Sequence, residues 1–234
     1  DADGRVGTDQ VVGGVRGRHV VIRPSGADNA RPTPTMGAVS HRTVAILAFD
    51  DMEVLDFAGP YEVFNVAGEL GEGNPFQVFS VGLTGAPAVG RGGFTVLPTY
   101  SLDDAPPPDL LVLPGGAGTR PLVHDERLVD WIRDRAAEVE LLLSVCTGAL
   151  LLGAAGLLER RTATTHHDAY DELAAVSPTT KVVRGQRFVR SSDTVLTSAG
   201  VSAGVDLALH VVQLLAGQET RDRTAAEMEW MWQS

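Results

Sequence analysis

From Thr43 onward, short aliphatic runs alternate with longer segments whose apolar residues recur at helical spacing. Runs rich in Val, Ile and Leu that are too short for helices are typical of buried strands. They predict strands at 43–49, 76–83, 109–116 and 140–145, with two or three short strands within 181–200. Segment 93–102 is expected to be an edge strand or a hairpin arm. Helices are expected at 53–70 (interrupted near Gly59-Pro60), 125–139, 147–158, 168–176, 201–217 and 218–230.

This alternation of strands and helices predicts an α/β domain. Strands that are apolar on both sides indicate a mostly parallel sheet with helices covering both faces. Right-handed crossovers bring the carboxyl ends of parallel strands to one edge of the sheet, where ligands usually bind. Two loops follow such strand ends, the Gly-rich 113–118 and the Cys-containing 144–148.

The first 42 residues differ from the rest, because they are rich in Gly, Arg, Pro and Asp and lack periodicity. We expect residues 1–42 to be a flexible N-terminal extension and residues 43–234 to form a single domain. Met36 leaves open that the folded part of the chain starts there.

Composition and charge narrow the classes of function. The formal net charge of −11 argues against a nucleic-acid partner, because phosphate contacts need Lys and Arg. The chain has a single cysteine, so an internal disulfide is excluded, and no apolar run is long enough to span a membrane. No signal peptide is evident, and we expect a cytoplasmic protein. No metal cluster, phosphate loop or dinucleotide fingerprint is visible, so we expect neither cofactor nor metal.

The single cysteine, Cys146, lies where an expected strand becomes an expected helix, within Ser144-Val145-Cys146-Thr147-Gly148. Small residues two positions before and after it allow a sharp turn, the geometry of a nucleophile elbow. A lone cysteine is more often buried and inert, but this context favours a nucleophile. A helix N-terminus favours a thiolate, so we expect a thiol of lowered pKa.

Two further segments carry candidate polar groups. Gly115, Gly116 and Ala117 follow a strand end, where backbone N–H groups could bind substrate or stabilise a developing oxyanion. His166 is a candidate base or orienting residue for the cysteine, and the neighbouring His167 is a candidate substrate contact. A histidine in such a segment is as easily structural.

Two carboxylates lie at the start of the first expected helix. Glu53 and Asp56 are three residues apart and share a face if that segment is helical. Asp56 lies between Leu55 and Phe57, and a carboxyl in apolar surroundings has a raised pKa. A solvated helix start for Glu53 and a structural cap for Asp56 are the alternatives.

Together these segments resemble the ThiJ/PfpI superfamily, related to class I glutamine amidotransferases. The matching segments occur in order and extend from about Thr43 to about Gly217; they are LDFAGPYEVF, LPGGAGT, SVCTGALLLGAAGLLERRTATTHH and TSAGVSAGVDLALHVV. The resemblance implies a flavodoxin-like, doubly wound sheet. With Thr147 directly after the cysteine, the chain resembles two subgroups of this superfamily. These are the isocyanide (isonitrile) hydratases and the amidotransferase-like domain of AraC-type regulators. The protease-like branch has histidine at that position.

If the resemblance to isocyanide hydratases holds, Cys146 attacks the isocyanide carbon and Asp56 donates a proton to that carbon and positions water. Thr147 and the Gly115/Gly116 region then hold the polar intermediate, and hydrolysis of a Cys146 thioimidate releases an N-substituted formamide. The substrate is thus a small electrophile, and relatives imply a homodimer. His167 stands where the hydratases usually have an aromatic residue.

Two alternatives remain at this stage. A glyoxalase or deglycase acting on 2-oxoaldehydes would use the glutamate matching Glu53 as its base. A non-catalytic ligand- or redox-sensing domain would instead let the cysteine oxidise readily. The chain ends at Ser234 with one short acidic helix, and we therefore expect no helix-turn-helix pair and no DNA-binding regulator.

Overall fold

The structure, a computed structural model, describes residues 41–232 of the chain. Apart from His41 and Arg42, the expected N-terminal extension lies outside the described residues. The first strand, β1, begins at Arg42, one residue before the expected start.

The centre of the fold is a seven-stranded sheet in the order β10-β11-β7-β6-β1-β2-β5. All neighbours pair in parallel except β10 and β11, which are antiparallel. The α/β class and the mostly parallel sheet are therefore confirmed. The strands are β1 (Arg42–Ala48), β2 (Phe76–Gly82), β5 (Tyr100–Ser101), β6 (Leu110–Leu113), β7 (Leu141–Val145), β10 (Phe188–Arg190) and β11 (Val195–Ser198).

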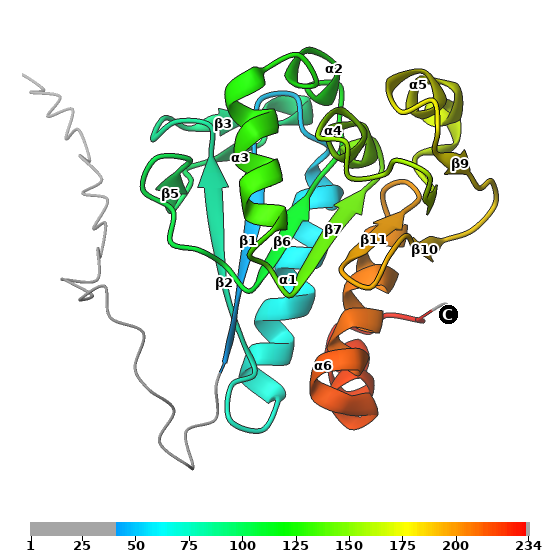
Figure 1. Ribbon diagram of the computed structural model, residues 1–234. Helices are drawn as coiled ribbons and strands as arrows, with labels where there is room; N and C mark the ends of the chain where they lie inside the picture. The colour runs from blue at the N-terminus through cyan, green and yellow to red at the C-terminus, as the bar shows by residue number, and fades with distance from the viewer. Residues whose placement is uncertain (1–40, 233–234) are drawn as a thin grey trace, which may run out of the picture. The chain divides into compact units, whose positions relative to one another are not determined.

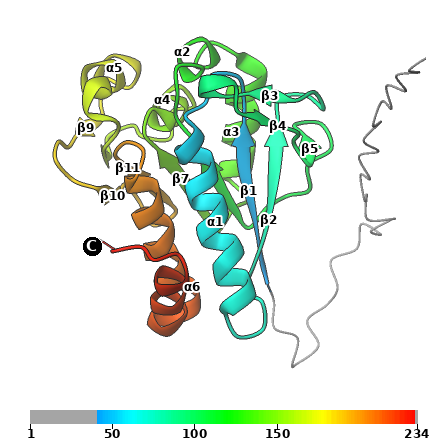
Figure 2. The ribbon, with the colours of Figure 1, turned by 180° about the vertical axis from the view of Figure 1, so that it is seen from behind.

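Helices cover both faces of this sheet. In Figures 1 and 2, α1 (Val54–Leu70) and α6 (Ala203–Glu227) lie on one face, and α3 (Glu126–Ala136) and α4 (Gly148–Ala154) lie on the other. Shorter elements complete the described chain; they are α2 (Thr119–Leu122), α5 (Tyr170–Val176), the 3-10 turns η1 (Arg91–Gly93) and η2 (His167–Ala169), and the two-stranded sheets β3 (Ala88–Val89) with β4 (Thr95–Val96) and β8 (Thr162–Ala163) with β9 (Lys181–Val182).

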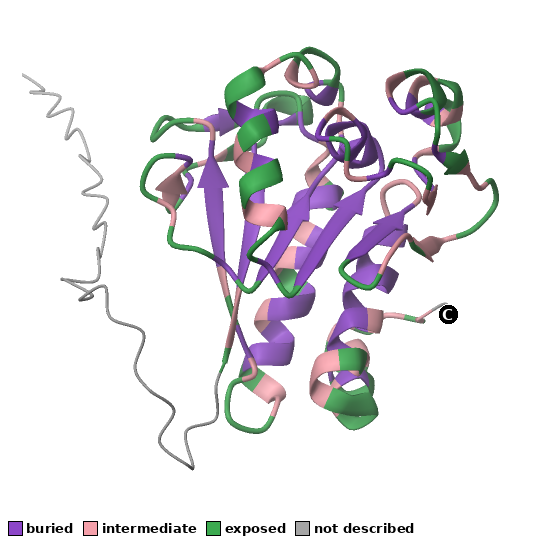
Figure 3. Cartoon of the chain, viewed as in Figure 1, coloured by how far each residue is buried: buried purple, intermediate pink, exposed green. Residues whose placement is uncertain are grey.

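The strands of the sheet are the core of the fold. Every residue of β6, β7 and β11 is buried, as are the last five of β1, and Figure 3 shows the sheet as the buried layer between the helices. Parallel strands covered on both faces need apolar side chains on both sides, which explains the continuous aliphatic runs in the sequence. No helix within residues 41–232 combines the length and the hydropathy needed to cross a bilayer.

The structure corrects the expected interruption of the first long helix. Helix α1 runs from Val54 to Leu70 and contains Pro60. Proline removes one helical donor and normally disrupts a helix interior. Here Gly59 packs closely against Val205 of α6, at a distance where a Cβ would lie 2.8 Å from the valine methyl. Packing of α1 on α6 thus outweighs the cost of Pro60, which is buried.

Two other regions refine the expected elements. Segment 93–102 is divided: β4 is a hairpin arm paired with β3, and β5 is the edge strand beside β2. The two C-terminal helices are confirmed as parts of α6, which breaks at Gly217, where φ is 88°. Only glycine adopts such a backbone conformation without strain.

Candidate active site

Cys146 lies in a sharp turn between β7 and α4. Its backbone φ is 57°, in the left-handed region that non-glycine residues rarely occupy. Gly148 makes the turn possible, since a Cβ there would lie 2.1 Å from the Leu113 carbonyl oxygen of β6. The strand-to-helix elbow expected from the sequence is therefore present, and Cys146 is only 6% exposed.

Backbone contacts from two other segments fix the position of Cys146. Its N–H donates to the carbonyl oxygens of Ser198 and Ala199, at 3.2 and 3.1 Å, at the end of β11. Its own carbonyl oxygen accepts a 2.8 Å hydrogen bond from the Thr165 hydroxyl. A strained backbone persists only where its surroundings hold it, and these bonds supply that constraint.

Asp56 is the carboxylate that the structure brings to the cysteine. It lies in the first turn of α1 and is 0% exposed. Its Oδ2 accepts the Gly115 N–H at 3.0 Å, while its Oδ1 is buried and meets no donor at full hydrogen-bond geometry among the described residues. The Cys146 thiol and the Val201 N–H also act on this carboxyl as donors that lower its pKa.

Burial dominates the titration of both groups. Removal from water raises the pKa of the Asp56 carboxyl to about 7 and the pKa of the Cys146 thiol to about 12. The negative charge of Asp56 raises the pKa of the thiol further, and the Thr147 backbone N–H lowers it. The expected thiol of lowered pKa is therefore wrong, because burial and the neighbouring carboxylate outweigh the short helix α4.

These two groups titrate as one unit because the charge of Asp56 acts directly on the thiol. The first proton leaves the pair near pH 7 and the second only in strong alkali. Between these limits the pair holds a single proton, which the higher pKa of the thiol places on the sulfur. A thiolate thus forms when the proton moves to Asp56, rather than existing beforehand.

The raised pKa of Asp56 predicts an effect on stability. Between pH 4 and 7 the folded state keeps a proton that the unfolded state has released, so stability falls as pH rises through this window. At about 1.4 kcal/mol per pKa unit, the cost above pH 7 is on the order of 4 kcal/mol. Asp56→Asn removes this cost, and we expect its unfolding midpoint to exceed that of the wild type increasingly from pH 4 to pH 8.

Urea unfolding at several pH values measures this difference. Asp193→Asn is a matched control, because it makes the same change at an exposed carboxyl in a turn, where no pH-dependent difference is expected. A gap between Asp56→Asn and wild type that stays constant from pH 4 to 8 would contradict the raised pKa.

The Gly-rich loop is placed beside the pair, but two of its N–H groups are already engaged. Gly115 N–H donates to Asp56, and Gly116 N–H donates to the Thr147 hydroxyl at 2.8 Å. The same hydroxyl can donate to the Gly116 carbonyl oxygen at 3.0 Å. The structure thus gives Gly115, Gly116 and Thr147 a role in positioning, not that of free oxyanion donors. Ala117 is exposed, and it follows Gly116, which forms an antiparallel bridge with Met52.

Glu53 lies at the start of α1 but is directed toward a different partner. Its carboxylate forms a 2.7 Å ion pair with Arg91, a largely exposed residue of η1. Its backbone N–H donates to the Gly115 carbonyl oxygen at 2.8 Å. The charge of Glu53 raises the pKa of Asp56, although only Asp56 acts on the thiol itself.

The two histidines lie at the edge of the site. His166 packs against Gly200, where a Cβ would lie 2.2 Å from its ring, and its Nδ1 accepts the Asp168 N–H at 3.3 Å. Among the described residues it makes no hydrogen bond to Cys146. His167 is 73% exposed on its side chain. His166, His167 and Asp168 place their potential metal-binding atoms within 4.8 Å of one another. Among the described residues, this group could hold a metal ion.

Sequence reasoning missed Val201 and Arg91 as parts of the site. Val201 has a φ of 51°, unusual for a β-branched residue, and directs its N–H to Asp56. Its place after a Ser-Ala-Gly turn at a strand end was the available signal, since such turns meet the other strand ends at one edge. Arg91 had none, because its pairing with Glu53 depends on the β3–β4 hairpin.

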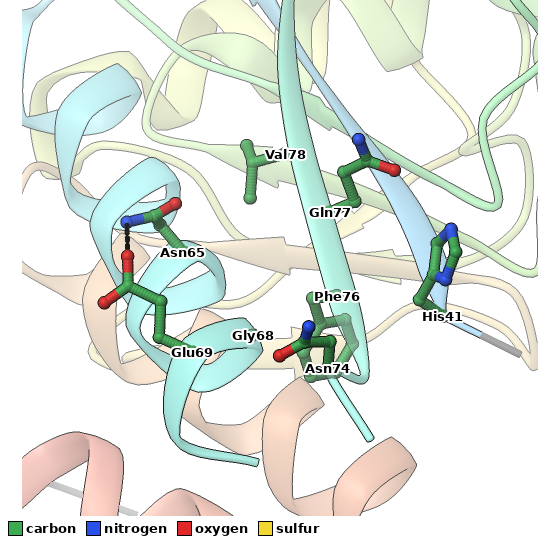
Figure 4. Close-up of a pocket in the computed structure, with 8 residues that line it drawn as sticks. All are labelled: His41, Asn65, Gly68, Glu69, Asn74, Phe76, Gln77 and Val78. Atoms are coloured by element: carbon green, nitrogen blue, oxygen red, sulfur yellow. Dashed lines mark hydrogen bonds between the residues drawn. The ribbon is translucent and has the colours of Figure 1, made fainter. Parts of the chain in front are cut away.

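The pocket drawn in Figure 4 lies elsewhere on the molecule. It has a volume of about 410 Å3, lies between α1 and the start of β2, and includes Asn65, which donates to Glu69 at 3.2 Å. This is the amino-terminal edge of the sheet, opposite the loops that carry Cys146. No residue that the sequence singled out lines it.

The chain is similar to known proteins in sequence and in fold. Residues 42–214 match the model of the DJ-1/PfpI family. Isonitrile hydratase of Pseudomonas putida is 37% identical over 191 residues, which are 80% of this chain and 78% of the hydratase. The crystal structure of a ThiJ/PfpI family protein from Pseudomonas syringae superposes with a TM-score of 0.74 at 28% identity, covering 88% of this chain and 85% of that one.

Similarity also extends to regulators. The HTH-type transcriptional regulator GbdR of Pseudomonas aeruginosa is 25% identical over 178 residues, which are 76% of this chain and 48% of the regulator. This chain therefore corresponds to about half of that protein. The identity to the hydratase is higher and covers most of both chains.

Proposed function

Because the chain belongs to the DJ-1/PfpI family, we propose that it is a cofactor-independent hydratase that uses Cys146 to convert isocyanides to N-substituted formamides. The buried pair of Cys146 and Asp56 is the observation that carries the proposal. A carboxyl with a pKa of about 7 can both accept and return a proton at neutral pH, which suits general acid–base catalysis.

The first half of the proposed reaction moves the thiol proton to the substrate. Asp56 takes the proton from Cys146 as the sulfur attacks the terminal carbon of the isocyanide. Asp56 then donates this proton to the same carbon, which leaves a thioimidate with a new C–S bond and a new C–H bond. The buried pair favours this route, because its one negative charge only moves from the carboxylate to the sulfur, and no second charge has to be created in the apolar site.

The second half returns the enzyme to its starting state. Water attacks the thioimidate carbon while Asp56, again ionised, accepts one of its protons. The nitrogen takes up the other proton, the C–S bond breaks, and the formamide leaves. The proton held by Asp56 then restores the thiol, so the sum is isocyanide plus water to formamide. Thr147 and the Gly115–Gly116 loop keep Asp56 and the sulfur aligned.

Glyoxalase chemistry on 2-oxoaldehydes is the second candidate and would depend on Glu53. The geometry favours the hydratase, since Glu53 is paired with Arg91 and Asp56 holds the position beside the sulfur. His166 and His167 have no assigned step in either reaction. A sensing domain remains the non-catalytic candidate, and the similarity to GbdR supports it.

A substrate panel tests the proposed function. The wild type and Cys146→Ala are incubated at pH 7.5 with p-nitrophenyl isocyanide, cyclohexyl isocyanide and methylglyoxal. We expect formamide from both isocyanides with the wild type and none above background with Cys146→Ala. Lactate from methylglyoxal with no formamide would assign the protein to the glyoxalase class. If neither formamide nor lactate forms from any of the three substrates, the result would favour the sensing domain.

We further propose that the protein acts as a cytoplasmic homodimer on a small electrophile. A catalytic thiol suits a reducing compartment. Large apolar side chains are exposed on α1 at Leu55 and in and directly after the β3–β4 hairpin at Val89, Phe94 and Leu97. Sedimentation equilibrium at micromolar concentration measures the assembly, and a monomer there would contradict it.

A further inference from the structure

A buried carboxylate behind the site, Asp206, has no role in the reaction described above. It lies in the first turn of α6 and is 0% exposed. A buried charge is costly unless it is paired and hydrogen-bonded. Asp206 forms an ion pair with Arg187 from the segment before β10, and its Oδ1 accepts the indole N–H of Trp230 at 2.9 Å.

Arg187 connects this carboxylate to the turn that holds the reacting pair. Its carbonyl oxygen accepts the Ala199 N–H at 2.8 Å, and its guanidinium lies 3.3 Å from the Ser202 hydroxyl oxygen. Arg187 therefore forms hydrogen bonds with both ends of the turn formed by residues 199–202.

The same turn contacts both members of the pair. The Ala199 carbonyl oxygen accepts the Cys146 N–H, and the Val201 N–H is directed to the Asp56 carboxyl. Val201 has a left-handed backbone, which needs support from its surroundings. Arg187, oriented by Asp206, provides that support.

Trp230 brings the end of the described chain into this network. The segment after α6 folds back along the helix, so that Trp230 reaches Asp206 across 24 residues of sequence. The Arg221 guanidinium carbon lies 3.9 Å from the centroid of the Trp232 ring. This contact is a second attachment of the same segment to α6. Figure 1 shows this C-terminal segment returning beside α6.

We propose that Asp206 is a positioning residue that, through Arg187 and with Trp230 as its second partner, holds the 199–202 turn so that Cys146 and Asp56 stay aligned. The proposal rests on the proposed function for the identity of the reacting pair. Its test uses alkylation of the single cysteine by iodoacetamide, which proceeds whether or not isocyanides are substrates.

The test compares Trp230→Phe, Asp206→Asn and wild type in the rate of Cys146 alkylation between pH 5 and 10. Displacement of a reacting group by about 1 Å can cost about 100-fold in rate. We expect alkylation at pH 7.5 to fall about 3- to 10-fold in Trp230→Phe and about 10- to 100-fold in Asp206→Asn. The midpoint of the pH profile should rise, because Asp56 loses the Val201 donor. Trp131→Phe on α3 makes the same side-chain change away from the site and should leave rate and midpoint unchanged.

A second pair of variants separates positioning from stability. Arg187→Lys keeps a charge for Asp206 and should retain more alkylation than Arg187→Gln. A merely structural role would lower the melting temperature in both while leaving the midpoint of the pH profile at the wild-type value. Wild-type rates and midpoints in folded Trp230→Phe would overturn the proposal, even if Asp206→Asn fails to fold.

Discussion

Replacing Cys146 by serine is expected to lower the turnover of isocyanides by more than about 1,000-fold. A serine hydroxyl at this elbow would occupy nearly the same place, but oxygen is a far weaker nucleophile than sulfur at neutral pH. Asp56 cannot compensate, since a carboxyl with a pKa of about 7 is too weak a base to deprotonate an alcohol to a useful extent.

Formamide production at saturating p-nitrophenyl isocyanide measures this loss. The serine variant should keep the fold, because the side chain is nearly isosteric and its backbone bonds to Ser198 and Ala199 are unaffected. A matched melting temperature is therefore the control for folding. Turnover by Cys146→Ser above a tenth of the wild-type value would exclude a covalent role for the sulfur.

Replacing Asp56 by asparagine is expected to lower turnover by about 100- to 10,000-fold, the usual contribution of a general acid–base group. The amide can still accept the Gly115 N–H but can neither take the thiol proton nor deliver it to the substrate carbon. The more stable protein predicted above for Asp56→Asn would thus be the less active one.

Glu53→Gln is the matched control, because it makes the same carboxyl-to-amide change three residues away. It breaks the ion pair with Arg91 and removes a charge that raises the pKa of Asp56, so we expect less than about a 10-fold change in turnover. Equal losses in the two variants, or a larger loss in Glu53→Gln, would contradict the assignment of Asp56.

Much of the fold could be predicted because its strands carry a strong and simple signal. The aliphatic runs ending at Ala48, Leu113 and Val145 are buried on both faces, and burial on both faces is what such runs indicate. The two-residue strands β8 and β9 are too short to show a period, and their pairing depends on contacts between distant segments. Pro60 was misjudged because tertiary packing outweighed a local rule.

In the site, too, features set by the nearby sequence could be predicted, whereas features set by contacts between distant segments could not. The turn at Cys146 followed from local spacing, and the pairing of Asp56 with the cysteine was implied by the resemblance to isocyanide hydratases. The direction of the thiol pKa did not, because it depends on how deeply α1 buries the pair and on the charge that Asp56 places beside the sulfur. The link from Arg187 to Asp206 and Trp230 joins three segments that no sequence spacing relates.

The proposed mechanism depends most on the sharing of one proton between Cys146 and Asp56. The pH dependence of Cys146 alkylation by iodoacetamide tests it most directly, since no other cysteine contributes to the signal. We predict that the wild-type rate rises through a midpoint near pH 7 and that Asp56→Asn moves this midpoint above pH 9, because burial still raises the pKa of the thiol. A midpoint that is the same in both proteins would contradict the shared proton and the mechanism built on it.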